Sequence, residues 1–537
     1  MTPQVRMNRS KFDLSKGVKT TMSVGRLYPI DIQEVLPGDT FKNKTVCVAR
    51  VTSSFFKPVM DNAFMDIYHF FVPYRLLYKD SERVFGNPNP SAYEDNDLSS
   101  FPSFGSQQTV VSGSIADYLG LPVGRIPGDI SVLPFRAFAK VYDQWFRNEN
   151  VVDEVYIQSG AKVASENLNA NDFAPNNYTG MPPYVGKKKD YFTSCLPSPQ
   201  KGAPVSVSLS GNLPVTTSSP TSPLILQSVG DAMKQIAVTS PNTPISTDSS
   251  VDIIGNYLGS STLGANTYLT LANNQLQVDA SDINFANIND LRFAFQLQKM
   301  LERDALYGSR YNEYLLGHFG VTSPDARLQF TEYLGGARIP IGVQQVAQTS
   351  EGTENSPLAN LGAFSLSNGR SRYSKGFVEH GYILTVACIR TMHTYQQGIN
   401  KMWSRLERND FYDPLYATLG EQPVYKSELY AVGQNSVKGD IFGYNEAWAD
   451  YRYSPSRVSG QMRSGIVNTL DKWHFADYYS NAPTLTEDFT DETSLFFDRT
   501  VSVPSESQDN FICDFWFDTK ATRVMPLYSI PGLIDHH

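Results

Sequence analysis

The chain has 537 residues, more than one ordinary domain but compatible with a single β core that carries long insertions. Its net charge is −9, so the chain as a whole is not a polycation that coats nucleic acid, and any nucleic-acid contact must be local. Charged residues make up only 18% and aromatic residues 12%, a combination typical of buried interface centres and also of a Tyr-rich secreted β protein.

The cysteines and the apolar segments indicate a reducing compartment. Four cysteines stand far apart, without any C-x-x-C pair, so we expect neither a disulfide framework nor a zinc site: Cys47, Cys195, Cys388 and Cys513. The basic start runs into a mixed polar stretch, unlike a signal peptide, and apolar runs such as residues 382–389 are too short to span a bilayer. We therefore expect a protein made in the cytoplasm, without membrane insertion.

The first thirty residues form a basic segment in which Asp13 is the only acidic residue. The basic residues are Arg6, Arg9, Lys11, Lys16, Lys19 and Arg26. Two interpretations remain open, a solvated flexible arm and an arm that faces phosphates. Under the second, the candidates for DNA contact are Arg6, Arg9, Lys11, Lys16 and Lys19.

Strand patterns are scattered from one end of the chain to the other. Residues 45–52 (TVCVARVT) alternate in polarity, and residues 64–72 (FMDIYHFFV) are β-branched and aromatic before Pro73. Residues 382–394 begin with a run that is apolar on both faces, as in the centre of a sheet. Residues 511–518 alternate with period two, which predicts a core strand close to the C-terminus.

The sequence predicts few helices. Pro134 begins a stretch in which aromatic residues recur at three- and four-residue spacing, namely Phe135, Phe138, Tyr142, Trp145 and Phe146. A second helix begins near Asn289 or Asp290 and stacks one face of side chains, namely Leu291, Phe295, Gln298, Leu301 and Ala305. We interpret both stripes as packing surfaces, not ligand sites.

The segment 200–285 has a different composition. Small and polar residues dominate it, with seven charged and three aromatic residues in 86 positions, and short runs at 223–229 and 267–271 suggest light β structure. We divide the chain into residues 1–199 (N-terminal arm and first part of the body), 200–285 (a surface insertion) and 286–537 (the remainder of the body with inter-subunit loops).

Motifs for catalysis or metal binding are absent from the sequence. The run Gly180, Gly186, Lys187 has one residue too many between its glycines for a phosphate-binding loop, and Lys188 stands where a Ser or Thr is needed. Histidines lack metal-ligand spacing, and His69 and His393 fall in strand-like segments that favour a hydrogen-bonded structural role. The acidic cluster at residues 94–97 lacks the remaining ligands of a calcium loop. We expect no cofactor and no enzyme activity.

One segment combines aromatic and basic residues, AWADYRYSPSRVSGQMRSG at 447–465. It interleaves Trp448, Tyr451 and Tyr453 with Arg452, Arg457 and Arg463. Such a surface suits single-stranded DNA through base stacking and guanidinium contacts, and it suits equally an interface in which the arginines pair with carboxylates of a neighbouring chain.

Several long runs resemble the gokushovirus major capsid protein, of the microviruses. They are residues 8–41, 55–77, 133–150 (LPFRAFAKVYDQWFRNEN), 318–329 (HFGVTSPDARLQ), 332–341 (EYLGGARIPI) and 450–465 (DYRYSPSRVSGQMRSG). This chain differs from the family pattern at three places. The family has Trp where this chain has Ser198, Arg-Pro where it has residues 330–331, and Arg-Gly-Gly-Thr where it has residues 306–309. These departures concern kinship to a particular phage, not membership of the family.

The resemblance implies a mainly β fold, an eight-stranded antiparallel jelly roll (viral capsid β-sandwich) with long loop insertions and a few helices. It implies self-assembly of sixty copies into a T=1 icosahedral shell around circular single-stranded DNA, with the insertion 200–285 as a threefold protrusion for host attachment. The implied partners are the packaged DNA, a small basic DNA-binding virion protein, a pilot protein and a host cell-surface receptor. The implied location is the virion, assembled in the cytoplasm of a bacterial host.

Two other functions compete with this hypothesis. A secreted β-sandwich protein that binds or cleaves glycans would account for the Tyr and Trp content, but it requires export. A single-strand-binding protein would account for the basic segments, but the net charge of −9 opposes it.

Overall fold

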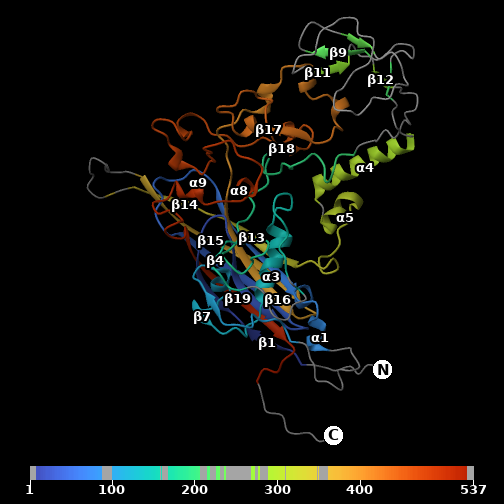
Figure 1. Ribbon diagram of the computed structural model, residues 1–537. Coiled ribbons are helices and arrows are strands. Elements are labelled where there is room, and N and C mark those ends of the chain that lie inside the picture. The colour runs from blue at the N-terminus through green and yellow to red at the C-terminus, as the bar shows by residue number, and fades with distance from the viewer. Residues whose placement is uncertain are drawn as a thin grey trace, which may run out of the picture. The chain divides into compact units, whose positions relative to one another are not determined.

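Antiparallel sheets dominate the computed structural model (Figure 1). The structure describes residues 8–86, 100–157, 159, 167–205, 288–308, 310–347, 349 and 361–528, and the backbone of five short strands between residues 215 and 278. Two compact units are present, residues 1–201 with 302–537, and residues 202–301.

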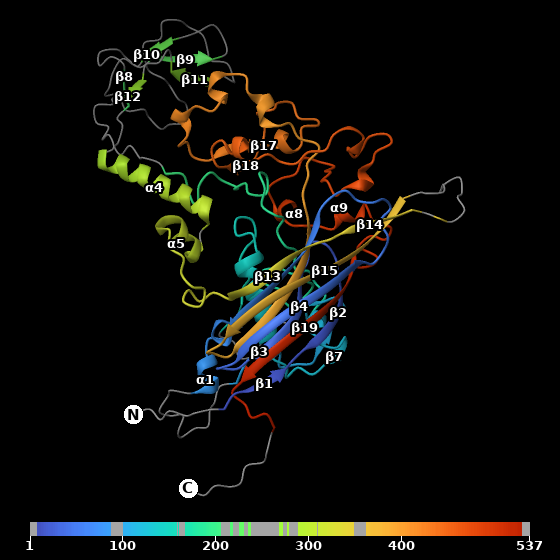
Figure 2. The ribbon, with the colours of Figure 1, turned by 180° about the vertical axis from the view of Figure 1, so that it is seen from behind.

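The first sheet joins strands from both ends of the chain. Its order is β1-β19-β4-β15-β14, and β2 also pairs with β19. The strands are β1 (Ser10–Asp13), β2 (Lys16–Met22), β4 (Thr40–Val51), β14 (Val343–Ala347), β15 (Leu361–Gly376) and β19 (Phe511–Arg523). Figure 2 shows β15, β4 and β19 side by side. The basic N-terminal segment is therefore β structure from Ser10 to Asp13 and from Lys16 to Met22.

The second sheet has the order β13-β5-β16-β3. Its strands are β3 (Leu27–Val35), β5 (Ala63–Pro73), β13 (Glu332–Pro340) and β16 (Gly381–Thr391). Along the chain, β2, β3, β4 and β5 alternate between the two sheets, β13 joins the sheet of β5, and β15, β16 and β19 alternate again. This connectivity, with every pairing antiparallel, is that of an eight-stranded jelly roll.

The core lies between the two sheets, because alternate side chains of each strand point inward. Phe511, Cys513, Phe515 and Phe517 of β19 are fully buried, as their period-two pattern predicts. Opposite them lie residues of the second sheet such as Met65. All four cysteines are free and buried.

His69 of β5 connects the two sheets. Its Nδ1 lies 2.9 Å from Thr385 Oγ1 of β16, and its Nε2 lies 2.9 Å from Ser371 Oγ of β15, in the other sheet. Burial lowers the pKa of His69 to about 3, so the ring is neutral. The predicted structural role of this histidine is confirmed.

A long connection between β5 and β13 covers one face of the second sheet. Its helix α3 (Leu133–Val141) continues as a π-helical turn, Tyr142–Phe146, and buries Phe135 and Phe138 beside Leu384 of β16. The predicted helix and its packing role are confirmed. The other elements are α1 (Ser81–Phe85), β6 (Gln108–Val110), α2 (Ile115–Tyr118) and β7 (Gly124–Ile126).

The second predicted helix is present, and its predicted stripe is exposed at the N-terminal end and buried at the C-terminal end. The helix is α4 (Ile288–Tyr307), followed by α5 (Tyr311–Phe319). Leu291 and Phe295 are exposed, and Ala305 is the residue of the helix that is buried. The predicted packing role is therefore confirmed at Ala305 but not at Leu291 and Phe295.

Short strands within residues 202–301 pair among themselves. They are β8 (Val215–Thr217), β9 (Ile225–Val229), β10 (Gln235–Ala237), β11 (Tyr268–Leu271) and β12 (Leu276–Val278), in sheets β10-β9-β11 and β12-β8. Strands β9 and β11 confirm the predicted light β structure at 223–229 and 267–271. Most of the predicted insertion 200–285 lies outside the described residues, so its boundaries and its place in an assembly stay predictions.

A second long connection joins β16 to β19 and has little regular structure. Its elements are β17 (Gln422–Tyr425), α6 (Lys426–Leu429), β18 (Ile441–Asn445), α7 (Ala449–Arg452), α8 (Glu487–Thr490) and α9 (Leu495–Asp498). Short 3-10 turns stand at Tyr74–Leu76, Lys401–Ser404, Arg408–Asp410, Pro414–Tyr416, Gly460–Met462 and Asp471–Trp473.

Truncation of a core residue in β19 tests the sandwich. We expect Phe515→Ala to lower the free energy of unfolding by about 3–5 kcal/mol, because it opens a cavity between the sheets. The control is Ile512→Ala, a truncation on the opposite, exposed face of the same strand, with an expected loss below about 1 kcal/mol. Urea unfolding measures both, and equal losses would contradict the assigned faces of β19.

Candidate functional site

Lys187, from the run that resembles a phosphate-binding loop, is not available to phosphate. Its side chain is buried, its Nζ lies 3.3 Å from Asp477 Oδ2, and the ammonium stands 4.8 Å from the centre of the Phe489 ring. The lysine is therefore part of a buried ionic cluster, and the rejection of a phosphate loop is consistent with its place in the fold.

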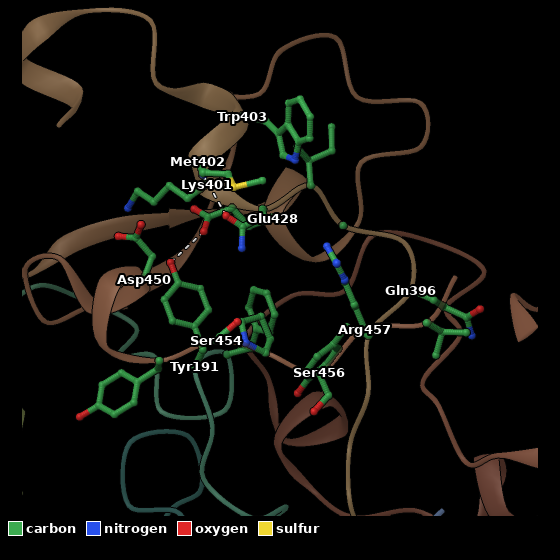
Figure 3. Close-up of a pocket in the computed structure, with 18 of the residues that line it drawn as sticks. Tyr191, Gln396, Lys401, Met402, Trp403, Glu428, Asp450, Ser454, Ser456 and Arg457 are labelled. Carbon is green, nitrogen blue, oxygen red and sulfur yellow. Dashed lines mark hydrogen bonds between the residues drawn. The ribbon is translucent and has the colours of Figure 1, made fainter. Parts of the chain in front are cut away.

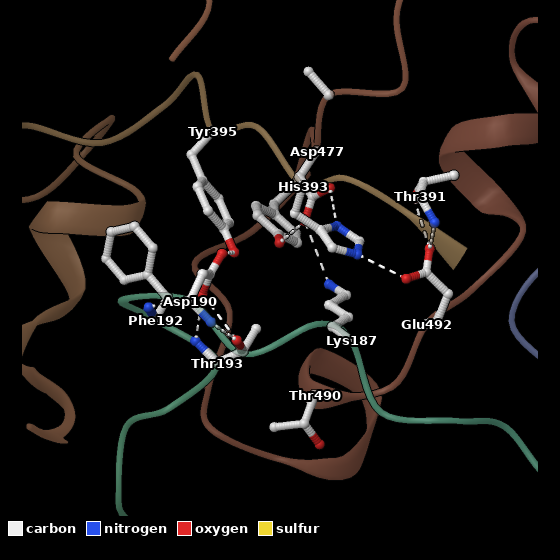
Figure 4. Close-up of polar contacts among 12 residues, drawn as sticks. Lys187, Asp190, Phe192, Thr193, Thr391, His393, Tyr395, Asp477, Thr490 and Glu492 are labelled. Carbon is white, nitrogen blue, oxygen red and sulfur yellow. Dashed lines mark hydrogen bonds and ion pairs between the residues drawn. The ribbon is translucent and has the colours of Figure 1, made fainter. Parts of the chain in front are cut away.

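The centre of this cluster is His393, which follows β16 (Figure 4). His393 Nδ1 lies 2.8 Å from Asp477 Oδ1, and Nε2 lies 2.9 Å from Glu492 Oε2. Since both ring nitrogens face carboxylates, both donate, and the imidazole carries a positive charge. Tyr479 donates to Asp477 Oδ2 at 2.6 Å, and Thr391 donates its hydroxyl to Glu492 Oε1 at 2.7 Å.

The pKa values of His393 and Asp477 are those of an ion pair. Burial alone lowers the pKa of His393, but the charges of Asp477 and Glu492 outweigh burial and raise it to about 10. Burial alone raises the pKa of Asp477, but His393 and Lys187 outweigh it and hold the value at about 2. His393 and Asp477 are thus both charged at neutral pH, unlike a catalytic acid or base, whose pKa lies near the operating pH.

The cluster joins segments that are distant in sequence. Lys187 comes from the connection between β5 and β13, whereas Asp477 and Glu492 come from the connection between β16 and β19. A neighbouring contact repeats the link, since Tyr395 donates to Asp190 Oδ2 at 2.6 Å. The structural role predicted for His393 is confirmed, but sequence gave no signal for its partners.

The aromatic and basic segment 447–465 borders a cavity of about 1220 Å³ (Figure 3). Trp403 and Lys401 from the turn after β16 also line it, together with Tyr191 and Glu428. Glu428 accepts a hydrogen bond of 2.8 Å from the Tyr191 hydroxyl, and burial raises the pKa of this carboxyl. The cavity therefore offers a mixed aromatic and cationic lining.

The three arginines of the segment have different surroundings. Arg452 forms an ion pair with Glu446, and Arg463 donates to the carbonyl oxygen of Gln396 at 2.6 Å. Arg457 lines the cavity, and within the described part of the chain its guanidinium has neither a hydrogen bond nor an ion pair (Figure 3). Arg457 and Arg463 thus share the cavity wall, whereas Arg452 is occupied elsewhere.

The basic N-terminal candidates lie on or beside the edge of the first sheet. Arg6 is outside the described residues, and Arg9 is exposed just before β1. Lys11 is exposed on β1, Lys16 forms an ion pair of 2.5 Å with Asp31, and Lys19 forms one of 3.4 Å with Asp514. Their contact with DNA stays a prediction.

The described residues contain neither a cluster of metal ligands nor a helix that could span a membrane. Among the described residues, His, Cys, Asp and Glu form no group of three or more that could hold a metal ion. The acidic cluster at 94–97 lies outside those residues. No described helix is both long enough and apolar enough to cross a bilayer.

The His393 cluster predicts a dependence of stability on pH. The folded pKa is about 10 and the ordinary value is 6.5, so the stabilisation is complete below pH 6.5 and is lost as the pH rises through 10. We expect the difference in unfolding free energy between the native protein and His393→Gln to shrink by several kcal/mol across that range. Urea titrations at both ends measure it, and a constant difference would refute the assignment.

Removal of the carboxylate of Asp477, which pairs with both Lys187 and His393, should lower the stability of the fold. Asp477→Asn leaves two buried cations without their common counter-charge, so we expect a loss of about 3–5 kcal/mol in unfolding free energy. The control is Asp440→Asn, which removes an exposed pair with Lys426 and should cost less than about 1 kcal/mol. A loss for Asp477→Asn no larger than that of the control would contradict a stabilising cluster.

Comparisons with known proteins agree over nearly the whole chain. The family model for the capsid protein known as F protein matches residues 1–533. The chain is 37% identical to capsid protein VP1 of Spiroplasma virus 4, covering 98% of this chain and 95% of that protein. It is 36% identical to VP1 of Bdellovibrio phage phiMH2K and of Chlamydia phage 1, each over 99% of this chain and 96% of the relative. The jelly-roll connectivity and these matches together show that the chain belongs to the F-protein family of phage capsid proteins, as a major capsid protein of the gokushovirus-like microviruses and a component of the virion.

Proposed function

We propose that this capsid protein assembles as sixty copies into a T=1 icosahedral shell that encloses a circular single-stranded DNA genome. The insertion 200–285 projects at the threefold axes and attaches to a receptor on the host cell. A small basic DNA-binding protein and a pilot protein accompany the shell. Family membership and the jelly-roll connectivity support a structural role, and the surface of the single chain supports assembly.

The observation that carries the assembly is a set of exposed apolar side chains in the connection between β16 and β19. Leu406 is 87% exposed and Leu415 is 86% exposed. The set comprises Met402, Trp403, Leu406, Phe411, Tyr412, Leu415, Tyr416, Leu419, Tyr451, Tyr453, Ile466, Val467 and Leu470. We call this set the loop surface. Soluble monomers rarely expose so many large apolar side chains on one segment, and such surfaces mark protein–protein contacts.

The occupant of the loop surface is a second copy of the chain. Obligate interfaces bury about 2,000 Å² or more and are rich in aromatic side chains, as this surface is. Closed symmetry then repeats a single set of contacts around the shell, so that no apolar side chain is left at a free edge. Leu291 and Phe295, which are exposed on one face of α4, suit the same use.

A glycan-cleaving function has weaker support. It needs a pair of free carboxyl groups across a cleft, and the cavity beside segment 447–465 contains Glu428 and Asp450. Glu428 is engaged by Tyr191, and Asp450 forms an ion pair with Arg405. These carboxylates therefore serve internal contacts.

Introducing charge at the loop surface tests assembly. We expect the double variant Leu406→Asp with Leu415→Asp to stay folded, because both side chains are exposed, and to stay a small species in sedimentation where the native chain forms closed particles. The matched control, Leu406→Met with Leu415→Met, keeps the surface apolar and should still assemble.

Electron microscopy and circular dichroism complete the experiment. The native chain should give uniform closed shells by microscopy, and the charged variant should retain the native dichroism spectrum. Particles of normal yield from the charged variant would remove the loop surface from the assembly. A native chain that stays monomeric at high concentration would count against the shell itself.

A further inference from the structure

The outward face of the first sheet carries a concentration of positive charge that the functional analysis above does not use. Alternate residues of β4, β15 and β19 point away from the core and are aligned by the strand register. We call these residues the outer sheet face. Its basic members without a hydrogen bond or ion pair among the described residues are Lys42, Lys44, Arg50, Arg370 and Arg372.

Acidic residues of the outer sheet face contact neighbouring side chains of the same face, and they are fewer than its basic residues. Asp514 lies 3.4 Å from Lys19 Nζ, and Asp13 and Asp518 both pair with Lys520, Asp518 at 3.5 Å. Asp509, just before β19, accepts hydrogen bonds from the hydroxyls of Thr21 and Ser23. The face therefore has a net positive charge, although the whole chain has a net charge of −9.

Like charges stand opposite each other on this face. Arg372 of β15 is directly opposite Lys44 of β4 in the register, and the neighbour of Lys44 on its other side is Asp518 of β19, which pairs with Lys520. Facing cations on neighbouring strands are destabilising in an isolated sheet, because their side chains lie close together. An anionic ligand relieves that repulsion, which makes this arrangement typical of a binding surface.

One tryptophan lies on this face, between Asp514 and Asp518 along β19. Trp516 of β19 is 53% exposed and is separated from Arg370 only by Val46 in the register. Its indole also contacts Gly17 on β2, where a Cβ would stand 3.4 Å from the ring, so one part of the ring is fixed while the rest is open. Val48 on the neighbouring strand β4 adds exposed apolar surface.

We infer that the outer sheet face binds single-stranded nucleic acid without sequence preference, with phosphates at Lys44, Arg370 and Arg372 and a base stacked on Trp516. A flat sheet with cations and an exposed aromatic ring is a recurring way to hold single strands. The cations follow two neighbouring strands at alternate positions, so they present a row of charges that suits a phosphate backbone. The inference rests on the proposed function, because it names where the enclosed genome contacts the shell.

Binding of an oligothymidylate of roughly 16 nucleotides to the purified full-length chain, followed by fluorescence anisotropy at several salt concentrations, tests the inference. The triple variant Lys44→Gln, Arg370→Gln, Arg372→Gln should bind at least about tenfold more weakly. The slope of log affinity against log salt should become less negative by roughly 2, since each lost phosphate contact contributes about 0.7.

The matched control removes the same charge from exposed arginines elsewhere, with Arg125→Gln, Arg303→Gln and Arg327→Gln. It should change the affinity less than about threefold and leave the salt slope unchanged. Equal affinity and equal slope for the two triple variants would overturn the inference.

Substitution of the tryptophan separates stacking from charge. Trp516→Phe keeps a stacking ring and should keep the affinity within about threefold, while the quenching of tryptophan fluorescence by the oligonucleotide is lost. Trp516→Ala should weaken binding by about fivefold or more. Quenching that persists in Trp516→Phe would overturn the stacking role.

Particle assembly distinguishes this inference from the proposed function. Shells from the outer-face triple variant that form normally but hold less nucleic acid would support it. Weaker oligonucleotide binding by a chain that never assembles would support it while refuting the shell. Lost assembly with unchanged oligonucleotide affinity would assign the face to contact with a second copy and overturn the inference.

Discussion

Strand β19 lies between β2 and β4, and the rest of the molecule depends on this pairing. The register joins Phe511 to Met22, so the sheet closes only after almost the whole chain has been made. Phe511 and Phe515 then complete the core between the sheets. Loop closure costs rise slowly with loop length, so a sandwich closed in this way tolerates very long insertions. Non-local pairing also predicts slow folding.

The two long connections, from β5 to β13 and from β16 to β19, need a contact with each other, because the packing of α3 on the second sheet fixes only part of the first connection. The ionic cluster around His393 supplies this contact at the end of β16, where Lys187 of the first connection meets Asp477 of the second. Burying these charges is costly, and the attraction between them offsets that cost only in one geometry. The cluster therefore contributes more to the uniqueness of the loop arrangement than to the net stability of the chain.

Sequence patterns predicted the strands well because burial on one face leaves a period of two. Examples are the strands predicted at residues 511–518 and 45–52. The helix that begins near Pro134 was predicted equally well from its three- and four-residue spacing. The strand order and the jelly roll came from the family resemblance, since a local pattern does not state its partner. The partners of His393 were invisible for the same reason, being 84 and 99 residues away.

The outer sheet face was missed although a signal existed. Lys42 and Lys44, and likewise Arg370 and Arg372, stand two residues apart in strands whose intervening residues are buried. The same alternation that identifies a buried face also identifies a charged one on the opposite side of the strand. In α4 the predicted packing surface is exposed at Leu291 and Phe295. Helical spacing shows that a face is apolar, but it does not show which molecule covers that face.

The surface of the chain divides into parts with different requirements. Exposed apolar side chains on the loop surface are unfavourable in water, and the unpaired cations of the outer sheet face repel one another. Neither feature helps the single chain to fold, so the stability of the core must compensate for both. Because an apolar surface is covered by protein and a basic surface by an anion, the two surfaces require different partners. A shell built from such a chain therefore gains stability from its own copies and from its contents by separate interactions.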